Sequence, residues 1–477
     1  MTACEIASKV RSKELSALSV TEAAIARMEL FEDSIHAYCT PGKELARAMA
    51  KEIDRKISKG EDPGVMAGVP VGIKDLVATK DLKTVMGCKV YENFTPEEDD
   101  VVVERLKGAG AIIFGKTNVP ELGYSGVGHN PVFETTRNPW NLAMTPGGSS
   151  AGSGASVACG VTPLAIGSDG GGSIRIPAAH CGLYGMKASM GRVPLYPGCR
   201  DPSLPGVSSW ASLECIGPMA RNVEDAALMF SVISGPDPRD RLSIPLEFDW
   251  LQELKESFDL KGKKIGFSKD WGYAAVDQEV AAIVKACVYD IFQDKLGCVI
   301  EEADPGFSDP YGAFWGLVAG DSDLKGMRKW LPDHAHHMSP HLVDFLQKPW
   351  TAEELTTAGM HRHEVTNKMS QFMSNYDLLI TPTLAVPPFP VHTQGPEKIN
   401  GHIVHPVKWL CFTFIANMTG QPAATLPAGF TKDGLPVGLQ IMGKHLDDKT
   451  VLKASKLFQE AKPWKDHWPN LVNDLVV

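Results

Sequence analysis

The stretch that decides the fold is TPGGSSAGSGASVACGVTPLAIGSDGGGSIRIPAAHCGLYGMK, which runs from Thr145 to Lys187. It places two serines directly after glycine runs: Ser149 follows Gly147–Gly148, and Ser173 follows Gly170–Gly172. Glycine weakens helices and strands, so this density indicates unusual backbone geometry or close approach to a ligand. Consecutive N–H groups left free by such a turn form a nest for negative charge. A serine at the nest can attack a carbonyl while the nest holds the oxyanion.

A lysine further upstream could supply the base that such a serine needs. Lys74 lies in the otherwise apolar segment Pro70–Val77, where a charged amine is costly unless it is neutral or hydrogen-bonded. A desolvated lysine with a lowered pKa can accept a hydroxyl proton. Each residue also has a structural interpretation: Lys74 could reach water from a strand end, and Ser149 and Ser173 could cap helices. Neither cap explains why Gly170–Gly172 stands directly before a serine.

The first 62 residues predict a helical flank. Thr2–Glu5 and Ser19–Glu22 both match the capping box that opens a helix. Thr40-Pro41 predicts the start of a third helix, because proline is favoured at the first helical position. We expect these helices to pack on the larger body that follows them.

A sheet is predicted after this flank. Pro70–Val77 is short and β-rich, Val101–Lys107 has helical spacing and Ala111–Phe114 has the pattern of a strand, which together indicate a βαβ unit. Further strands are predicted at 264–267, 378–380, 424–426 and 437–441. The fold class that follows is α/β, with one central mixed, mostly parallel sheet covered by helices on both faces.

No linker-like stretch divides the chain, so we expect a single domain over residues 1–477. Residues 1–62 are its helical flank, and residues 63–230 form the catalytic core that holds the glycine-framed serines. Residues 300–365 contain the least regular segment, 304–357, which is rich in Pro, Trp, Gly and His. Because long irregular segments are often binding loops, this region is the predicted cover over the substrate site.

Composition excludes several classes of protein. The net charge of −10 argues against nucleic acid or an anionic membrane as the main partner. No apolar run is long enough for a membrane span, and the N-terminus lacks the apolar core of a signal peptide. The ten cysteines form no C-x-x-C pair, which favours reduced thiols over disulfides or a zinc site. The predicted location is the cytoplasm.

Other motifs are present but lack the context that their chemistry needs. Residues 110–117, GAIIFGKT, match a P-loop pattern, yet the positions that should form a flexible loop are an apolar strand. Residues 148–152 match the G-x-S-x-G elbow around Ser150, but loop residues 138–146 precede it where a strand is required. A Ser–His–Asp hydrolase using Ser150 therefore stays an alternative. A histidine cluster could bind a metal, but we favour a solvated loop and predict no metal site there: His334, His336, His337 and His341.

Taken together, these segments resemble the amidase signature family. The resemblance is carried by Gly147–Ser150 and by Gly167–Ala178, GSDGGGSIRIPA, and by the spacing of 75 residues from Lys74 to Ser149 and 24 from Ser149 to Ser173. It extends along most of the chain, through segments 115–118, 138–140, 216–221, 376–383, 420–422 and 436–440. It is weakest over about 300–365.

The resemblance implies a Ser–Ser–Lys triad. Ser173 would be the nucleophile, and Ser149, preceded by a cis peptide bond, would relay its proton to an uncharged Lys74. The backbone amides of Gly170, Gly171, Gly172 and Ser173 would hold the oxyanion of an intermediate that leads to an acyl-enzyme. Members of the family often carry a bulkier residue at the position of Gly170.

Residues around the triad are assigned by the same resemblance. Asp169 and Arg175 flank Ser173, and we expect them to pair and to hold the glycine turn rigid. Gly123, Tyr124 and Ser125 should line the acyl pocket, although Tyr124 could equally be a core aromatic.

The sequence therefore predicts a serine amidohydrolase that cleaves the C–N bond of linear amides, with aryl amides and carbamates (urethanes) as candidate substrates. It would need no cofactor, and its only predicted partner is that small molecule. One rival is the A component of a tRNA-dependent amidotransferase, which would need a tRNA surface and further protein partners. Another is a binding protein on an amidase scaffold without turnover.

Overall fold

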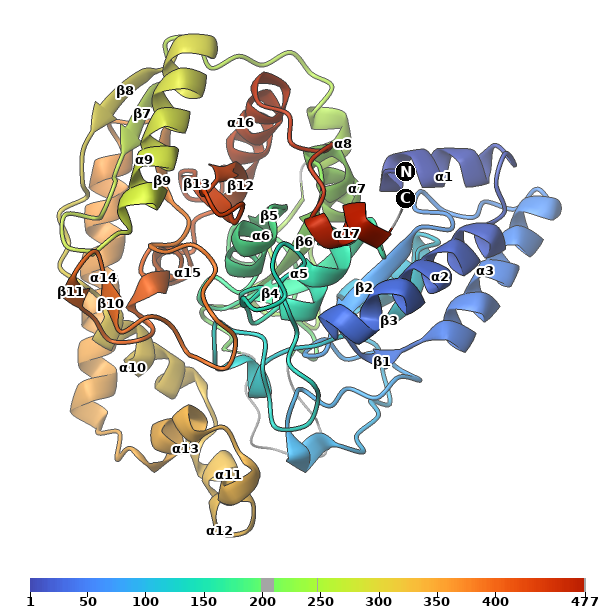
Figure 1. The fold of residues 1–477 in the computed structure, drawn as a ribbon, viewed down its shortest axis with the longest axis horizontal. Coiled ribbons are helices and arrows are strands. Elements are labelled where there is room, and N and C mark those ends of the chain that lie inside the picture. Colours follow the sequence, from blue (N-terminus) through green and yellow to red (C-terminus); the bar gives the residue numbers. More distant parts are fainter. Residues whose placement is uncertain (199–209, 247, 476–477) are drawn as a thin grey trace.

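The computed structural model describes residues 1–198, 210–246 and 248–475. Its centre is an 11-stranded sheet with the strand order β1-β3-β2-β4-β6-β5-β12-β13-β9-β7-β8 (Figure 1). The strands are β1 (Tyr38–Pro41), β2 (Pro70–Lys74), β3 (Ile112–Thr117), β4 (Leu164–Asp169), β5 (Tyr184–Lys187), β6 (Cys215–Ala220), β7 (Lys264–Phe267), β8 (Val299–Glu302), β9 (Leu378–Pro382), β12 (Ala423–Phe430) and β13 (Pro436–Met442). Strands β10 (Lys398–Ile399) and β11 (His402–Ile403) form a separate hairpin.

The mixed sheet of an α/β fold is confirmed, but the expectation of mostly parallel pairing is wrong. Six of the ten neighbouring pairs are antiparallel, and four are parallel. The parallel pairs lie toward the two ends of the sheet, in β3-β2-β4 and β9-β7-β8. In the middle, β4-β6, β6-β5, β5-β12 and β12-β13 are all antiparallel, and residues 431–435 join β12 to β13 as a short hairpin connection.

Helices cover both faces of the sheet. Leu164 and Ile166 of β4 pack into the cluster that includes helix α7, whereas Ala165 between them packs against α5 and α6. This alternation is what a strand buried on both faces requires. The helices are α1 (Ala3–Arg11), α2 (Ala17–Ile35), α3 (Lys43–Ser58), α4 (Val101–Gly108), α5 (Ala151–Ala158), α6 (Arg175–Cys181), α7 (Val223–Ile233), α8 (Trp250–Glu253), α9 (Gln278–Cys287), α10 (Tyr311–Asp321), α11 (Leu324–Arg328), α12 (Leu331–His334), α13 (Pro340–Gln347), α14 (Ala352–Met373), α15 (Phe414–Thr419), α16 (Asp448–Ala461) and α17 (Asn470–Leu475).

The N-terminal flank is helical, with two corrections. The capping box at Thr2–Glu5 is confirmed at the start of α1. The second box is wrong: α2 begins at Ala17, before the predicted cap Ser19, and Ser16 is its N-cap. Pro41 ends strand β1 instead of opening a helix. β1 is an edge strand and pairs with a neighbour on one side only. The N–H that proline lacks is therefore not needed for a hydrogen bond to a second strand.

The predicted βαβ unit is confirmed as β2, α4 and β3, with β2 and β3 parallel. The P-loop pattern falls largely inside β3, which includes Gly115, Lys116 and Thr117. Lys116 is buried and donates to Val77 O and Thr84 Oγ1. These residues therefore form an internal strand and not a phosphate-binding loop.

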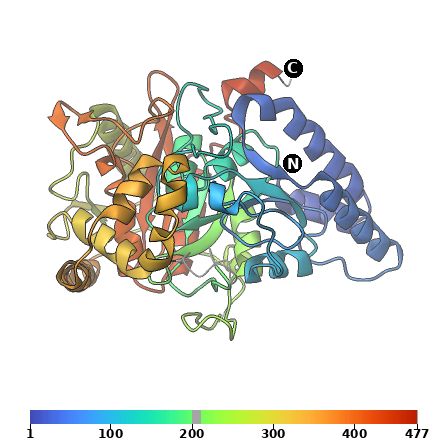
Figure 2. The same ribbon diagram turned by 90° about the horizontal axis from the view of Figure 1, so that it is seen from below.

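Residues 300–365 are more regular than expected. They contain α10 to α13 and the start of α14, so the prediction of an irregular segment over 304–357 is wrong. Figures 1 and 2 show these helices, in yellow to orange, at the end of the molecule away from the N-terminal helices in blue. The apolar spacing is hidden in the sequence because the helices are short: α11 follows an Asp cap, and α12 and α13 each have a proline in their first turn.

Two further findings concern the described part of the chain. None of its helices is long and apolar enough to cross a membrane. Its His, Cys, Asp and Glu side chains form no group of three that could hold a metal ion, and this includes His334, His336, His337 and His341.

Helix α5 approaches the sheet so closely that Gly152 has no room for a side chain. A Cβ there would lie 2.1 Å from Ala37 O and 2.4 Å from Asn118 N, both backbone atoms. We expect Gly152→Ala to lower the free energy of unfolding by at least about 2 kcal/mol. Gly359, inside α14 with no atom within 4 Å of such a Cβ, is the matched control, and Gly359→Ala should raise stability by about 0.5–1 kcal/mol. Denaturant unfolding measures both, and equal effects would contradict the close approach.

Candidate active site

Lys74 is buried at the end of β2 and contacts three oxygens. Its Nζ lies 2.8 Å from Ser149 Oγ, 2.9 Å from Ser168 O and 2.9 Å from Ser168 Oγ. The side chain is 0% exposed, so it does not reach water from a strand end. The Ser168 carbonyl can only accept, whereas the two hydroxyls can donate or accept. The arrangement is therefore compatible with an uncharged amine, whose lone pair accepts a hydroxyl proton.

Ser149 does not act as a helix cap. The residue at the N-cap of α5 is Ser150, and the Ser149 hydroxyl contacts Lys74. The peptide bond between Gly148 and Ser149 is cis, as the family resemblance implied. Ser149 is only 2% exposed, so its hydroxyl faces the interior of the site.

Ser149 and Ser173 line one small cavity. Its volume is about 20 Å³, which is room for about one water molecule. The structure thus brings together the three residues predicted from the sequence: Lys74 touches Ser149, and Ser149 shares the cavity with Ser173. The other lining residues are Leu76, Leu122, Gly123, Ser168, Gly170, Trp210 and Glu214.

A side chain from another segment packs closely against each glycine of the run 170–172. A Cβ on any of these glycines would lie within 3 Å of a side chain from a distant part of the sequence. The nearest atoms to such a Cβ are Trp210 Cε3 at 2.4 Å for Gly170, Phe314 Cζ at 2.7 Å for Gly171, and Thr413 Oγ1 at 2.3 Å for Gly172. The space that a bulkier residue would take at Gly170 is thus filled by Trp210.

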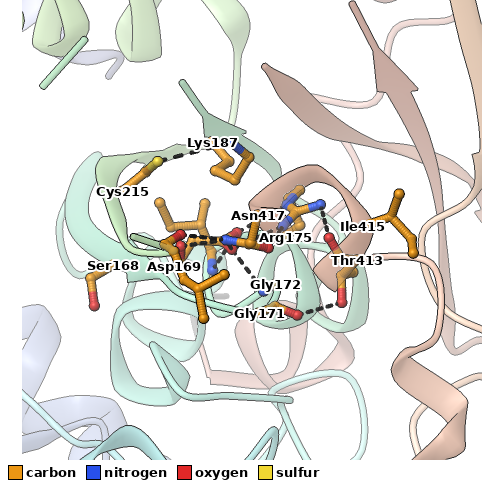
Figure 3. Close-up of polar contacts among 12 residues, drawn as sticks. Ser168, Asp169, Gly171, Gly172, Arg175, Lys187, Cys215, Thr413, Ile415 and Asn417 are labelled. Carbon is orange, nitrogen blue, oxygen red and sulfur yellow. Dashed lines mark hydrogen bonds and ion pairs between the residues drawn. The ribbon is translucent and has the colours of Figure 1, made fainter. Parts of the chain in front are cut away.

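Asp169 and Arg175 form a buried ion pair that holds this turn (Figure 3). Arg175 Nε and Nη2 each donate to one Asp169 oxygen at 2.9 Å. Asp169 also accepts from the backbone N–H groups of Gly172 at 2.7 Å and Ile174 at 3.3 Å. Burial alone would raise the pKa of Asp169, but the Arg175 guanidinium and its hydrogen bonds lower it to about 2. The expected pairing of these residues is present in the structure.

Several residues of the site were not found from the sequence. One is Ser168, whose hydroxyl contacts Lys74. It stands directly before Asp169 in the glycine-rich stretch, and this position is the sequence feature that could have indicated a role in the site. Thr413 and Asn417 come from the segment around α15, more than 230 residues beyond the turn. Asn417 Nδ2 donates to Asp169 O at 2.7 Å and to Asp169 Oδ1 at 2.9 Å, and Arg175 also reaches Gln440 Oε1 at 2.7 Å. Contacts over such separations leave no local pattern.

The three residues predicted to line an acyl pocket lie differently from one another. Gly123 lines the cavity and has a φ of 76°. A Cβ added to it would lie 3.5 Å from Ser149 Oγ. Tyr124 lies behind Trp210: its hydroxyl accepts from Trp210 Nε1 at 3.1 Å and lies 2.6 Å from Ser322 Oγ. Ser125 Oγ donates to Gln394 Oε1 at 2.6 Å.

Ser150, the centre of the elbow pattern, has a different environment. It is 0% exposed, and its hydroxyl donates to Ser168 O at 3.4 Å. Within residues 1–198, 210–246 and 248–475, no histidine forms a hydrogen bond with it. The geometry does not provide the base that a Ser–His–Asp arrangement needs.

Comparison with known proteins assigns the chain to a family. The Amidase family model matches residues 19–452, and the chain belongs to this amidase signature family of hydrolases. It is 37% identical to an acylamidase of Rhodococcus erythropolis, covering 98% of this chain and 97% of that protein. It is 36% identical to the A component of the glutamyl-tRNA(Gln) amidotransferase of Carboxydothermus hydrogenoformans, covering 99% of each. A solved structure of a bacterial aryl acylamidase of the same family matches 100% of this chain and 98% of its own, with 32% identity and a TM-score of 0.90.

The lowered pKa of Asp169 makes stability depend on pH. Because the folded-state pKa is about 2 against an ordinary 3.8, the contribution of Asp169 is fully present above pH 4 and is lost as pH falls toward 2. We expect Asp169→Asn to cost about 3–5 kcal/mol at neutral pH, since it leaves Arg175 buried without its counter-charge. The difference from wild type should stay constant from pH 7 to 5 and shrink below pH 4.

Denaturant unfolding over this pH range measures the effect. Glu364→Gln, which removes one partner of an exposed pair with Lys368, is the control and should change stability little at any pH. A difference between wild type and Asp169→Asn that grows on acidification would contradict the assignment.

Proposed function

We propose that this protein is a stand-alone serine amidohydrolase that cleaves the C–N bond of linear amides. Ser173 is the nucleophile, Ser149 the proton relay and Lys74 the base. The observation that carries the proposal is the buried 2.8 Å contact between Lys74 Nζ and Ser149 Oγ beside the cavity shared with Ser173. Burying an amine is costly, and this one lies beside the hydroxyl from which the proposed relay must take a proton.

The first half of the reaction forms an ester. The Ser173 hydroxyl gives its proton to Ser149 Oγ, and Ser149 gives its own proton to the uncharged Lys74. Ser173 Oγ attacks the substrate carbonyl, and the carbonyl oxygen becomes an oxyanion stabilised by the amides of the glycine turn. The Gly172 N–H donates to Asp169 at rest, so within the predicted set Gly170 and Gly171, with the Ser173 amide, carry most of this role.

The second half returns the proton and releases the acid. The proton passes from Lys74 through Ser149 to the leaving nitrogen, the C–N bond breaks, and the amine departs from an acyl-enzyme on Ser173. Water then attacks the ester with the same residues as base and acid. All these steps are acid–base and covalent chemistry of side chains, so the proposal requires no cofactor.

The substrate class is proposed from the cavity and from the relatives. The space beside Ser173 is small and partly apolar, with Leu76, Leu122 and Trp210 in its wall. Apolar walls suit the apolar acyl or aryl part of a linear amide, and carbamates share the same carbonyl geometry. The likeness to an acylamidase and an aryl acylamidase supports the same choice.

We further propose a single domain, with residues 300–365 as the cover of the site, because Phe314 of α10 reaches Gly171.

The A component of an amidotransferase is the second candidate, favoured by the 36% identity to such a protein over the whole chain. The two candidates differ in what they need. A stand-alone enzyme hydrolyses amides as purified, whereas an amidotransferase component would copurify with its partner proteins and supply ammonia to a charged tRNA. Purification from a native source, followed by mass spectrometry, separates them.

Substitution of the four central residues tests the mechanism. With an acyl p-nitroanilide as substrate, we expect Ser173→Ala to lower kcat/KM by at least about 10³-fold, because no acyl-enzyme forms. Lys74→Ala and Ser149→Ala should each cost at least about 10²-fold. Ser150→Ala, the matched control one residue away, should cost less than about tenfold. A fluorophosphonate probe should label Ser173, which peptide mapping detects.

Three outcomes would overturn the proposal. Loss of activity in Ser150→Ala with retention in Ser173→Ala would favour the elbow arrangement. Absence of turnover with nitroanilide, primary amide and carbamate substrates, together with no labelling by the probe, would favour a binding protein. Full activity of Lys74→Ala at neutral pH would show that Lys74 is not the base of the reaction.

A further inference from the structure

The peptide between Gly171 and Gly172 is held at both of its polar ends. Thr413 Oγ1 donates to Gly171 O at 2.6 Å, and the Gly172 N–H donates to Asp169 Oδ1 at 2.7 Å (Figure 3). The carbonyl and the N–H of one planar peptide point in opposite directions. These two hydrogen bonds therefore fix the direction of the whole peptide plane.

Thr413 is itself held in place by the ion pair that supports the turn. It is 0% exposed, and its carbonyl accepts from Arg175 Nη1 at 2.7 Å. Its hydroxyl also lies 3.0 Å from Leu410 O, but it has one hydrogen, and the shorter contact is to Gly171. Arg175 thus positions both groups that hold the peptide: the Asp169 carboxylate on one side and Thr413 on the other.

The turn needs such support because its own residues impose no direction. Gly172 has a φ of 124°, which only glycine adopts readily, and three consecutive glycines leave the backbone with many accessible conformations. An oxyanion is stabilised only if the amides are already aimed at it before it forms. The aim of the amides at Gly171 and Ser173, on either side of the held peptide, depends on that peptide's orientation.

We propose that Thr413 is a positioning residue for the reaction: its hydroxyl holds the Gly171–Gly172 peptide so that the neighbouring amides face the oxyanion. The inference rests on the proposed function, since it needs Ser173 as the nucleophile. Thr413 does not touch the reacting atoms. Its hydrogen bond should matter more in the transition state than in the bound substrate, because only the transition state carries the negative oxygen.

The test is the pair Thr413→Val and Thr413→Ser. Valine keeps the shape and removes the hydroxyl, and we expect it to lower kcat about 10- to 100-fold with KM changed less than about threefold, an effect like the loss of one oxyanion donor or less. Serine keeps the hydroxyl, and we expect kcat within about threefold of wild type. If valine does not fold, Thr413→Ala compared with Thr413→Ser gives the same contrast, because these two differ only by the hydroxyl.

A second readout separates positioning from a general structural effect. A peptidyl or acyl trifluoromethyl ketone, which forms a tetrahedral adduct with a serine, should bind Thr413→Val more weakly by the same factor that kcat/KM falls. Thr21→Val is the matched control: Thr21 is also 0% exposed, and its hydroxyl donates to Ala17 O at 2.9 Å in α2, away from the site. It should shift Tm and leave both kcat and ketone affinity unchanged.

The inference is wrong if Thr413→Val keeps kcat within threefold of wild type, or if Thr413→Ser and Thr413→Val lose activity equally. In either case loss of activity in Ser173→Ala would still uphold the proposed function. Retained activity in Ser173→Ala would instead overturn the proposed function, whatever the Thr413 variants do.

Discussion

The ion pair between Asp169 and Arg175 is the interaction on which the rest of the site depends. Both side chains are 0% exposed, and removing two charges from water is costly unless every remaining lone pair and N–H group finds a partner. Here the partners are the groups that must be ordered: two backbone amides of the turn, the Thr413 carbonyl, Asn417 and Gln440. The requirement to satisfy the buried charges thus gathers the end of β4, the start of α6, the segment around α15 and strand β13.

The order of strands explains how Lys74 meets this turn. β2 and β4 are parallel neighbours, so their carboxyl ends lie at the same edge of the sheet. Lys74 is the last residue of β2, and Ser168 and Asp169 are the last residues of β4. The amine therefore reaches the Ser168 oxygens, and the glycine turn begins directly beyond them. The antiparallel pairing in the middle of the sheet does not disturb this edge, because β2 and β4 both belong to the parallel part.

Local signals made much of this site predictable. Glycines before Ser149 and Ser173, and a lysine in an apolar strand, are visible in short windows of sequence, and the strand at 264–267 is observed with those bounds as β7. Some of the errors have the opposite origin. Thr40-Pro41 matches the pattern of a helix start, but Pro41 ends an edge strand. Whether a strand lies at the edge of a sheet is decided by residues far away in the sequence. The pairing in the middle of the sheet is likewise decided by distant residues, whereas the helices after 304 have a local cause: they are too short to show a clear apolar spacing.

The glycine run shows why a long-range contact can decide a local sequence. Each of its three positions faces a side chain from a different segment: Trp210 from near β6, Phe314 from α10 and Thr413 from before α15. At each glycine, the neighbouring side chain occupies the space that a Cβ would need. A relative with a bulkier residue at Gly170 must move or shorten whatever stands at Trp210. The shape of the cavity beside Ser173 is thus set jointly by the turn and its neighbours, because Gly170 and Trp210 both line it and a side chain at Gly170 would need the space that Trp210 fills.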